Sequence, residues 1–356
     1  MMCKTISILL LLVTNLLCAQ TIKTPLGSSL QADEITKWLQ QKMQDNGTPG
    51  AQLAIINDGK VVFHSALGNA TLEAAVTKNT IFEGASLSKP MFAYFVMRLK
   101  EQGLINLDRP LYQYLPYTDI AHDERYKKMT ARHVLSHQTG FPNWRDEDGR
   151  TGLTLDFEPG SGFQYSGEGY QYLALVLQKI LNTNANGLQK RFHKEVAKPL
   201  GLQVTRYIQS KKNRKNKAAA FKAGTWYPDR DFGKEEFGAA YGVHSTALDW
   251  SRFMIALMNK KGLSEQGYEA LFGVQKELPD NHPNKTNGIT HLTLGFYGGE
   301  LPFGKIYGHG GNNDKKFTSM FFFVPETKIG MVLFTNSSFG EQMGLELFQY
   351  MMVAGR

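Results

Sequence analysis

The chain has 356 residues, of which 42% are hydrophobic and 20% charged, and its formal net charge at pH 7 is +8. This composition is typical of a globular protein that is long enough for one large domain or two smaller ones. Both cysteines, Cys3 and Cys18, lie near the N-terminus, which excludes disulfides and thiolate metal sites from the rest of the chain.

Residues 1–20 have the features of a secretory signal peptide. A lysine is followed by a short apolar run and then by small residues, and the run is too short to span a bilayer. We expect cleavage near residue 19 or 20 and a secreted or periplasmic mature chain, 21–356. Lipoprotein anchoring through Cys18 is an alternative, which Leu17 disfavours because leucine is a poor residue before a lipidated cysteine.

Apolar periodicity and turn residues predict the elements in chain order. The first elements are a helix over 32–45, strands over 52–56 and 61–64 joined at Asp58-Gly59, and a buried helix over 91–99. After a loop over 103–116, the middle of the chain is predicted to contain a short helix capped by Thr130, a buried helix over 169–181, a helix ending at 196–200, an irregular surface excursion over 205–235 and a helix capped by Thr246. The last elements are strands over 293–297, 305–307, 317–324 and 329–334 and a helix over 340–352.

Strands at both ends with helices between them predict an α+β fold rather than a βαβ alternation. One sheet would be assembled from both termini, with a largely helical subdomain inserted. No repeat or linker marks a boundary, so we interpret 21–356 as one catalytic unit.

Ser86 and Lys89 form the only Ser-x-x-Lys pair in the sequence, at the point where the chain turns helical. Their spacing places both on one face of that helix. A serine hydroxyl is a weak nucleophile until a base takes its proton, and a lysine kept neutral by burial is such a base. The helix N-terminus adds N–H groups suited to an oxyanion. The alternative interpretation is an N-cap serine beside a surface lysine.

Two other patterns favour structural roles. His133 and His137 have the spacing of a zinc-binding pair, but no third ligand is evident, which favours buried or capping histidines. The basic run 211–217 would suit anionic envelope polymers or nucleic acid, but without a nucleic-acid motif a solvated loop is favoured. We therefore predict no metal, no cofactor and no nucleic-acid partner.

Two downstream stretches contain possible partners for a Ser/Lys site. Tyr165 precedes a predicted helix, where its phenol would relay protons beside the lysine; a hydrogen-bonded core tyrosine is the alternative. The second stretch, between two predicted strands, consists of His309, Gly310, Gly311 and Asn312. Its small residues would let a substrate backbone lie along a strand edge, where His309 would contact the substrate. The alternative is a glycine-rich hairpin with an incidental histidine.

Three motifs taken in order resemble those of the penicillin-recognising serine hydrolases, which are Ser-x-x-Lys, Tyr-x-Asn and Lys/His-x-Gly. In this chain they read Ser86-x-x-Lys89, Tyr165-Ser166-Gly167 and His309-Gly310-Gly311. The family comprises class C β-lactamases, D,D-peptidases, D-aminopeptidases and related esterases. Similarity extends over about 33–350 and includes the flanking segments 132–140, 241–249, 323–326 and 333–336.

The resemblance implies an antiparallel sheet with flanking helices and a helical subdomain. It implies that Ser86 is the acylated nucleophile, Lys89 its base and Tyr165 a participant in proton transfer to the leaving group. The backbone N–H groups of Ser86 and Asn312 would form the oxyanion hole, and residues 309–311 would line the substrate strand.

Three departures from the family pattern matter. Gly167 stands where asparagine is usual, and the adjacent Glu168 is expected to point elsewhere. His309 replaces the lysine that class C β-lactamases place near the substrate carboxylate. Lys315 and Lys316 stand where the family often has glycine, so the pocket rim is expected to differ.

We therefore expect a secreted serine hydrolase that cleaves an ester or amide of a small molecule or peptide, of esterase or D-amino-acid peptidase type. A true β-lactamase or D,D-carboxypeptidase is one alternative. A catalytically silent homologue that binds cell-wall peptide or a partner protein is another. Cell-envelope association, the natural substrate, its stereochemistry and the oligomeric state stay open.

Overall fold

The computed structural model describes residues 21–228 and 235–353. The signal peptide predicted over 1–20, including Cys18, lies outside the described residues. In the described part, no helix is both long and apolar enough to cross a membrane.

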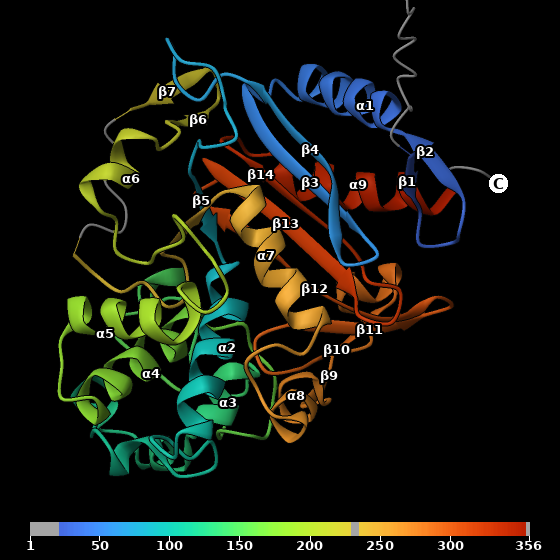
Figure 1. Cartoon of the computed structure of the whole chain (residues 1–356). Helices are drawn as coiled ribbons and strands as arrows, with labels where there is room; N and C mark the ends of the chain where they lie inside the picture. The colour runs from blue at the N-terminus through green and yellow to red at the C-terminus, as the bar shows by residue number, and fades with distance from the viewer. Residues whose placement is uncertain (1–20, 229–234, 354–356) are drawn as a thin grey trace, which may run out of the picture.

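An antiparallel sheet forms the centre of the molecule (Figure 1). Its strands are β3 (Gly50–Asn57), β4 (Lys60–Gly68), β9 (Lys276–Glu277), β10 (Ile289–Leu292), β11 (Tyr297–Leu301), β12 (Gly304–Asn313), β13 (Phe317–Val324) and β14 (Ile329–Thr335). Their spatial order is β4-β3-β14-β13-β12-β11-β10-β9. Because β3 pairs with β14, the sheet joins the two ends of the chain, as predicted.

Side chains alternate along these strands and give the sheet two apolar faces. In β3, Leu53 and Ile55 pack into one core and Ala54 and Ile56 into the other. The first core is completed by α1 (Ala32–Asp45) and α9 (Gly340–Val353). On the opposite face, α7 (Ala247–Met258) packs against β3 and β14 (Figure 1). With both faces covered, β3 is buried along its whole length.

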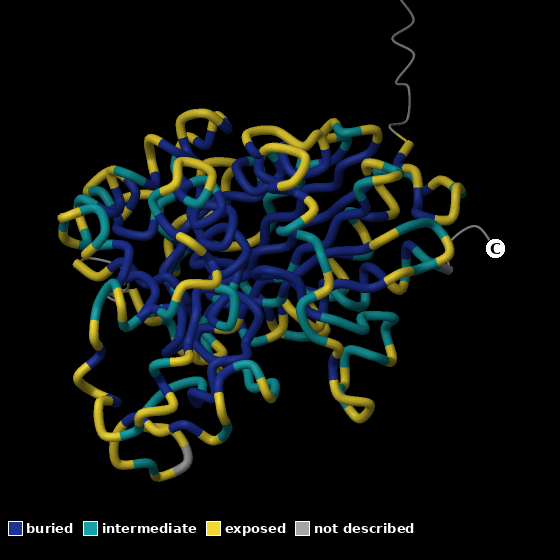
Figure 2. Tube along the Cα trace, turned by 90° about the horizontal axis from the view of Figure 1, so that it is seen from below, coloured by how far each residue is buried: buried dark blue, intermediate teal, exposed yellow. Residues whose placement is uncertain are grey.

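The helical subdomain lies beside the sheet (Figure 1). Along the chain it falls between β5 (Phe82–Ala85) and β8 (Val243–Ser245), and these two strands pair with each other. Its elements are α2 (Ser88–Glu101), α3 (Ala131–Leu135), α4 (Gly167–Ile180), α5 (Ala185–Phe192), the short 3-10 turns η1 (Leu111–Gln113), η2 (Thr118–Ile120), η3 (Glu124–Lys128) and η4 (Glu147–Gly149), and the π turn η5 (His193–Ala197). Nearly every residue of α2 is buried. Figure 2 shows the buried chain running through the middle of the molecule, with exposed positions at the outer loops.

The remaining described elements are peripheral. They are β1 (Thr21–Lys23), β2 (Ser29–Gln31), α6 (Lys211–Lys215), β6 (Ala220–Lys222), β7 (Thr225–Tyr227), α8 (Glu265–Phe272) and η6 (Pro283–Asn287). The helices predicted over 32–45 and 340–352 and after Thr130 and Thr246 are confirmed, and both threonine side chains cap as expected.

Two of the predicted segments differ from the structure. Residues 293–296 are not a strand but the connection between β10 and β11; Gly295 has a φ of +86° there, and a Cβ on it would lie 2.5 Å from the Cβ of Ala93. The segment 205–235 is not a mere surface excursion, because Tyr207 is fully buried and its hydroxyl donates to the carbonyl of Ser88 at 2.7 Å. Its last part, 229–234, lies outside the described residues.

The basic run 211–217 is likewise more structured than predicted. It forms the short helix α6, and Lys217 makes a 2.8 Å ion pair with Glu83, which is fully buried. The other carboxylate oxygen of Glu83 accepts from the Asn313 amide at 2.8 Å. A buried carboxylate requires such partners, so Asn313 ties β5 to the end of β12 and Lys217 ties it to the segment after α6.

Candidate active site

Ser86 lies in the turn between β5 and α2, not on the helix itself as the spacing predicted. Ala85 before it has a φ of 49°, a left-handed conformation that is uncommon for a residue with a side chain. Leu87 is the N-cap of α2. The neighbouring Ser88 is buried and bridges the two small strands, since its Oγ donates to Ala85 O at 2.6 Å and accepts from Val243 N at 2.8 Å. This turn leaves Ser86 partly accessible, just before the start of a buried helix.

Lys89 is almost completely buried, and its Nζ donates to Ser86 Oγ at 3.1 Å and to the carbonyl oxygen of Ala240 at 2.9 Å. The Nζ also lies 4.5 Å from the ring centroid of Tyr165 and 5.6 Å from that of Tyr170. No carboxylate within residues 21–228 and 235–353 forms an ion pair with it. Burial without a counter-charge lowers the pKa of Lys89 to about 7.

Tyr165 lies against the same pair of residues. Its ring stacks on His137 with a centroid separation of 4.4 Å, and His309 lies 6.0 Å away on a tilted plane. Burial raises the pKa of the Tyr165 phenol well above its usual value, while its hydrogen bond with Ser86 acts in the opposite direction. The phenol is therefore un-ionised and interacts with the serine hydroxyl.

His137 supports this tyrosine, whereas His133 does not take part. His137 is buried, and its Nδ1 accepts the backbone N–H of Ser166 at 3.1 Å, which places the ring proton on Nε2. Burial lowers its pKa well below the usual value. The predicted structural role of this histidine pair is confirmed for His137. Among the described residues, no three His, Cys, Asp or Glu side chains are grouped to hold a metal ion.

The stretch 309–313 is the half of β12 that has a neighbour on one side only. β12 pairs with β13 as far as Asn313, but its pairing with β11 covers only the residues from Gly304 to Gly308. The β11–β12 hairpin closes between Leu301 and Gly304. Counting the alternating ladder from that turn directs the N–H groups of Gly310 and Asn312 toward the unpaired edge. Such an edge can accept an extended substrate as an additional strand.

Gly311 and Gly310 are required by close approach on the two sides of this strand. A Cβ on Gly311 would lie 2.5 Å from the carbonyl oxygen of Gly84, in the strand that leads to Ser86. A Cβ on Gly310 would lie 2.0 Å from Oε1 of Glu341, which stands in the first turn of α9. The glycines thus hold the strand edge against the nucleophile turn on one face and against a carboxylate on the other.

His309 is 6% exposed, and its Nδ1 donates to the carbonyl oxygen of Gly310. Burial and the nearby Lys89 lower its pKa to about 3, so the ring is neutral. Unlike a lysine in this position, His309 supplies no positive charge to the site.

A cavity of about 750 Å³ joins these groups, since Ser86, Lys89, Tyr165 and residues 309–312 all line it. Several other side chains that line the cavity were not predicted from the sequence, namely Asn143, Trp144, Asp146, Tyr241, His282, Asn284, Tyr297 and Glu341. They come from loops, from η6 and from the starts of β11 and α9, and no motif spacing marks them. Only the glycines packed against Trp144 and Glu341 hint at them in the sequence.

Trp144 explains the glycine at position 167. A Cβ on Gly167 would lie 2.5 Å from Cη2 of Trp144, so the indole occupies the space of the usual asparagine side chain. The backbone N–H of Gly167 donates to Asn143 Oδ1 at 3.1 Å. The loop that carries Asn143 and Trp144 therefore forms the wall that an asparagine would otherwise supply.

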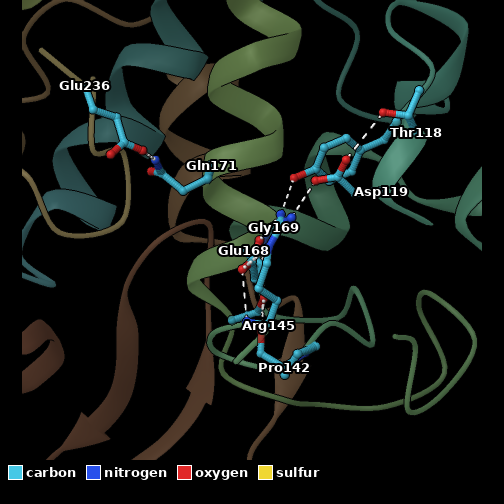
Figure 3. Close-up of polar contacts among 10 residues, drawn as sticks. Thr118, Asp119, Pro142, Arg145, Glu168, Gly169, Gln171 and Glu236 are labelled. Atoms are coloured by element: carbon cyan, nitrogen blue, oxygen red, sulfur yellow. Dashed lines mark hydrogen bonds and ion pairs between the residues drawn. The ribbon is translucent and has the colours of Figure 1, made fainter. Parts of the chain in front are cut away.

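Glu168 does not line the cavity that contains Ser86, as expected, and its carboxylate bonds Arg145 (Figure 3). Its Oε1 accepts from Nε of Arg145 at 2.9 Å and its Oε2 from Nη2 at 2.8 Å.

Beside Glu168, Gln171 of α4 bonds Glu236 (Figure 3) and accepts the N–H of Ala240 at 3.3 Å. Through Gln171, α4 positions Ala240, whose carbonyl oxygen accepts the hydrogen bond from Lys89 Nζ. The lysines Lys315 and Lys316 lie outside the cavity lining.

We predict that Gly167→Asn lowers the free energy of unfolding by about 1–3 kcal/mol, because the new side chain overlaps the Trp144 ring. Urea denaturation monitored by circular dichroism measures the change. In a Trp144→Ala background the same substitution should cost much less, since the obstructing ring is gone. Equal costs in both backgrounds would contradict this explanation of the glycine.

Comparison with known proteins gives one consistent family. The family model described as Beta-lactamase matches residues 35–356. Protein flp of Staphylococcus aureus is 23% identical over 329 residues, covering 85% of this chain and 62% of that protein. The chain thus spans about three fifths of the length of this relative.

Solved structures share the fold. A class C beta-lactamase matches with a TM-score of 0.75 at 19% identity, covering 91% of this chain and 96% of that one. A beta-lactamase/D-alanine carboxypeptidase from Pseudomonas syringae matches with a TM-score of 0.75 at 17% identity, covering 90% and 98%. The predicted α+β architecture with a sheet from both termini and an inserted helical subdomain is confirmed.

Proposed function

The chain belongs to the Beta-lactamase family of serine hydrolases, and on that premise we propose that it cleaves an ester or amide through an acyl-enzyme on Ser86, as an esterase or a D-amino-acid peptidase. The observation that carries the proposal is the 3.1 Å contact of Ser86 Oγ with a buried lysine whose pKa is about 7. We further propose that the chain is secreted, on the basis of residues 1–20.

In the proposed acylation step, neutral Lys89 takes the proton of Ser86 Oγ as the oxygen attacks the carbonyl carbon. The N–H groups of Ser86 and Asn312 are proposed to stabilise the oxyanion. Tyr165 then passes a proton to the departing alcohol or amine as its bond to carbon breaks, and the proton that Lys89 took from Ser86 replaces it on the phenol, which leaves Lys89 neutral again. Neutral Lys89 then takes a proton from a water molecule as the water oxygen attacks the ester carbonyl; the bond from that carbon to Ser86 Oγ breaks, Oγ receives the proton, and the acid is released.

His309 favours esterase or peptidase chemistry over a dedicated β-lactamase. Its neutral ring stands where a class C enzyme places a lysine for the substrate carboxylate, and it offers no charge to that group. A true β-lactamase or D,D-carboxypeptidase is the second candidate, supported by the names of the structural relatives. A silent binding homologue is disfavoured because Lys89 lies within hydrogen-bond distance of Ser86.

A two-part experiment on the purified protein tests the proposal. A fluorophosphonate probe should label the wild type and not Ser86→Ala, with the adduct located by peptide mass spectrometry. A panel of short-chain esters, D-amino-acid amides and a chromogenic cephalosporin then ranks the chemistries. Turnover of the cephalosporin above all others would favour the β-lactamase, and the lack of any adduct on the wild type would favour the binding homologue.

The rate of acylation should rise with pH through about 7 and then level off. Because burial lowers the pKa of Lys89 to about 7, the amine is protonated and inactive below that pH and neutral above it. Burial also lowers the pKa of His137 and of His309 well below the ordinary histidine value, so neither histidine causes the rise in rate near pH 7. Stopped-flow labelling from pH 5.5 to 9 measures it, and a rate that is flat or falls with pH would contradict Lys89 as the base.

We expect His309→Ala to change the ratio of kcat/KM between substrates more than it slows fluorophosphonate labelling. The reason is that the ring lines the cavity next to the free strand edge but makes no hydrogen bond to Ser86 or Lys89 in the described structure. His291→Ala, a histidine of β10 outside this cavity lining, is the control. A uniform loss on all substrates would oppose a role in selectivity.

A further inference from the structure

The cavity has a carboxylate beside the free strand edge that the proposed acylation does not use. Glu341 lies so close to Gly310 that its Oε1 would be 2.0 Å from a Cβ there. It lines the same cavity as Ser86 and Lys89. After burial, its charge is a smaller cause of the raised pKa of Tyr165 and of Tyr297, which places the carboxylate in the same cleft as these phenols.

Glu341 has no counter-charge in the described structure. No lysine, arginine or hydrogen-bond donor of residues 21–228 and 235–353 pairs with its carboxylate, although the residue is accessible at the cavity rim. Desolvation of the carboxyl by the cavity walls raises its pKa. By contrast, Glu346 on the same helix pairs with Lys42 at 2.8 Å. A carboxylate left without a partner at a cavity wall is a ready acceptor for a cation brought by a ligand.

His309 adds a second acceptor at the same edge. Its Nδ1 carries the proton that bonds Gly310 O, which leaves the lone pair of Nε2 with no protein donor among the described residues. The side chain is 6% exposed and lines the cavity. Glu341 on one face of β12 and His309 on the other thus place two side-chain acceptors beside Gly310, at the free edge of the strand.

Most of the charged groups that line the cavity are carboxylates. Besides Lys89, which the proposed mechanism uses in its neutral form, the charged residues of the described lining are Asp146, Asp314 and Glu341. A substrate carboxylate beside Glu341 would meet a like charge, whereas a protonated amine there would meet a complementary one.

We propose that the cleft selects substrates that carry a protonated amine, bound between the Glu341 carboxylate and Nε2 of His309 at the free edge of β12. This inference rests on the proposed function and names the substrate class of that site. Glu341 is a specificity residue in this scheme, and it takes no part in the proton transfers at Ser86.

Three p-nitroanilides of D-alanine test the inference, one with a free amine, one N-acetylated and one N-succinylated. At pH 7 an α-amine with a pKa of about 7.7–8.0 is mostly protonated. We expect kcat/KM to be about 10- to 100-fold higher for the free amine than for the acetylated compound, as for one charged hydrogen bond. The succinylated compound should be the poorest.

Variants of Glu341 assign the preference to that carboxylate. Glu341→Gln should lower kcat/KM for the free amine by about 10-fold or more, mainly through KM, and leave the acetylated compound nearly unchanged. Glu341→Lys should reverse the order and favour the succinylated compound. Glu346→Gln is the matched control on the same helix and should change neither.

The outcomes separate this inference from the proposed function. If Ser86 is labelled by fluorophosphonate but wild type and Glu341→Gln show the same amine-to-acetyl ratio, the inference is overturned and the hydrolase stands. If Ser86 is not labelled and no compound turns over, the proposed function itself fails. Labelling of Glu341→Gln at the wild-type rate shows that the variant is folded and that its loss concerns substrate selection.

Discussion

Replacing Lys89 with methionine is expected to lower kcat/KM by about 10³- to 10⁴-fold, the range for removing a general base. The amine lies 3.1 Å from Ser86 Oγ, and the described residues place no other titratable base in hydrogen-bond contact with that oxygen apart from the un-ionised Tyr165. Methionine fills the buried volume but accepts no proton. The rate of fluorophosphonate labelling measures the loss. Lys100→Met, on the same helix, is the control.

The same variant has a stability signature with a defined sign. The pKa of Lys89 in the folded chain is about 7, below the ordinary lysine pKa of 10.5, so between these pH values the unfolded chain binds a proton that the folded chain does not. This group therefore destabilises the wild type most at and below pH 7, and the penalty disappears as pH rises to 10.5.

Lys89→Met removes that penalty, which is on the order of a few kcal/mol, and loses the hydrogen bond to Ala240 O. The difference in unfolding free energy, variant minus wild type, should thus fall as pH rises from 7 to 10. Urea denaturation at several pH values measures it. A pH-independent difference together with near-wild-type turnover would refute Lys89 as a neutral buried base.

Tyr165→Phe is expected to reduce turnover by about 10²-fold or more, as for loss of an acid–base group. The phenylalanine ring keeps the stack on His137 and the position near Lys89 Nζ, so the loss reports the hydroxyl and not a rearranged cleft. Steady-state kcat and the burst of product release together show whether acylation or deacylation is slowed.

Tyr170→Phe is the matched control for this prediction. Tyr170 also lies beside Lys89 Nζ, but its hydroxyl donates to the carbonyl of Leu135 at 3.2 Å. Its loss should change turnover by only a few-fold. Similar losses in the two variants would mean that the phenol of Tyr165 has no special part in proton transfer.

Local signals in the sequence were sufficient for most elements of the fold. Thr130 and Thr246 cap helices because their side chains accept the free N–H groups of the first turn. Asp58 and Gly59 form the predicted hairpin between β3 and β4, both with positive φ. The failures occur where a distant contact decides the structure, as at Gly295 against Ala93 and at Tyr207 against Ser88.

The site shows the same division. The spacing of Ser86 and Lys89 and the order of the three motifs pointed to the residues that the structure brings to one cavity. Spacing and motif order did not reveal that Trp144 occupies the place of the missing asparagine, or that Glu341 lies against Gly310. These residues are far from their partners in sequence and follow no periodicity.

The sequence by itself determined the family, the order of elements and the pair Ser86 and Lys89, because motif spacing and periodicity are local properties of a chain. Only the tertiary structure decided the charge state of Lys89, since desolvation depends on what surrounds the amine and not on its neighbours in sequence. It also decided the sign of the cavity, because Glu341 reaches the free edge of β12 only through the packing of α9 on the sheet.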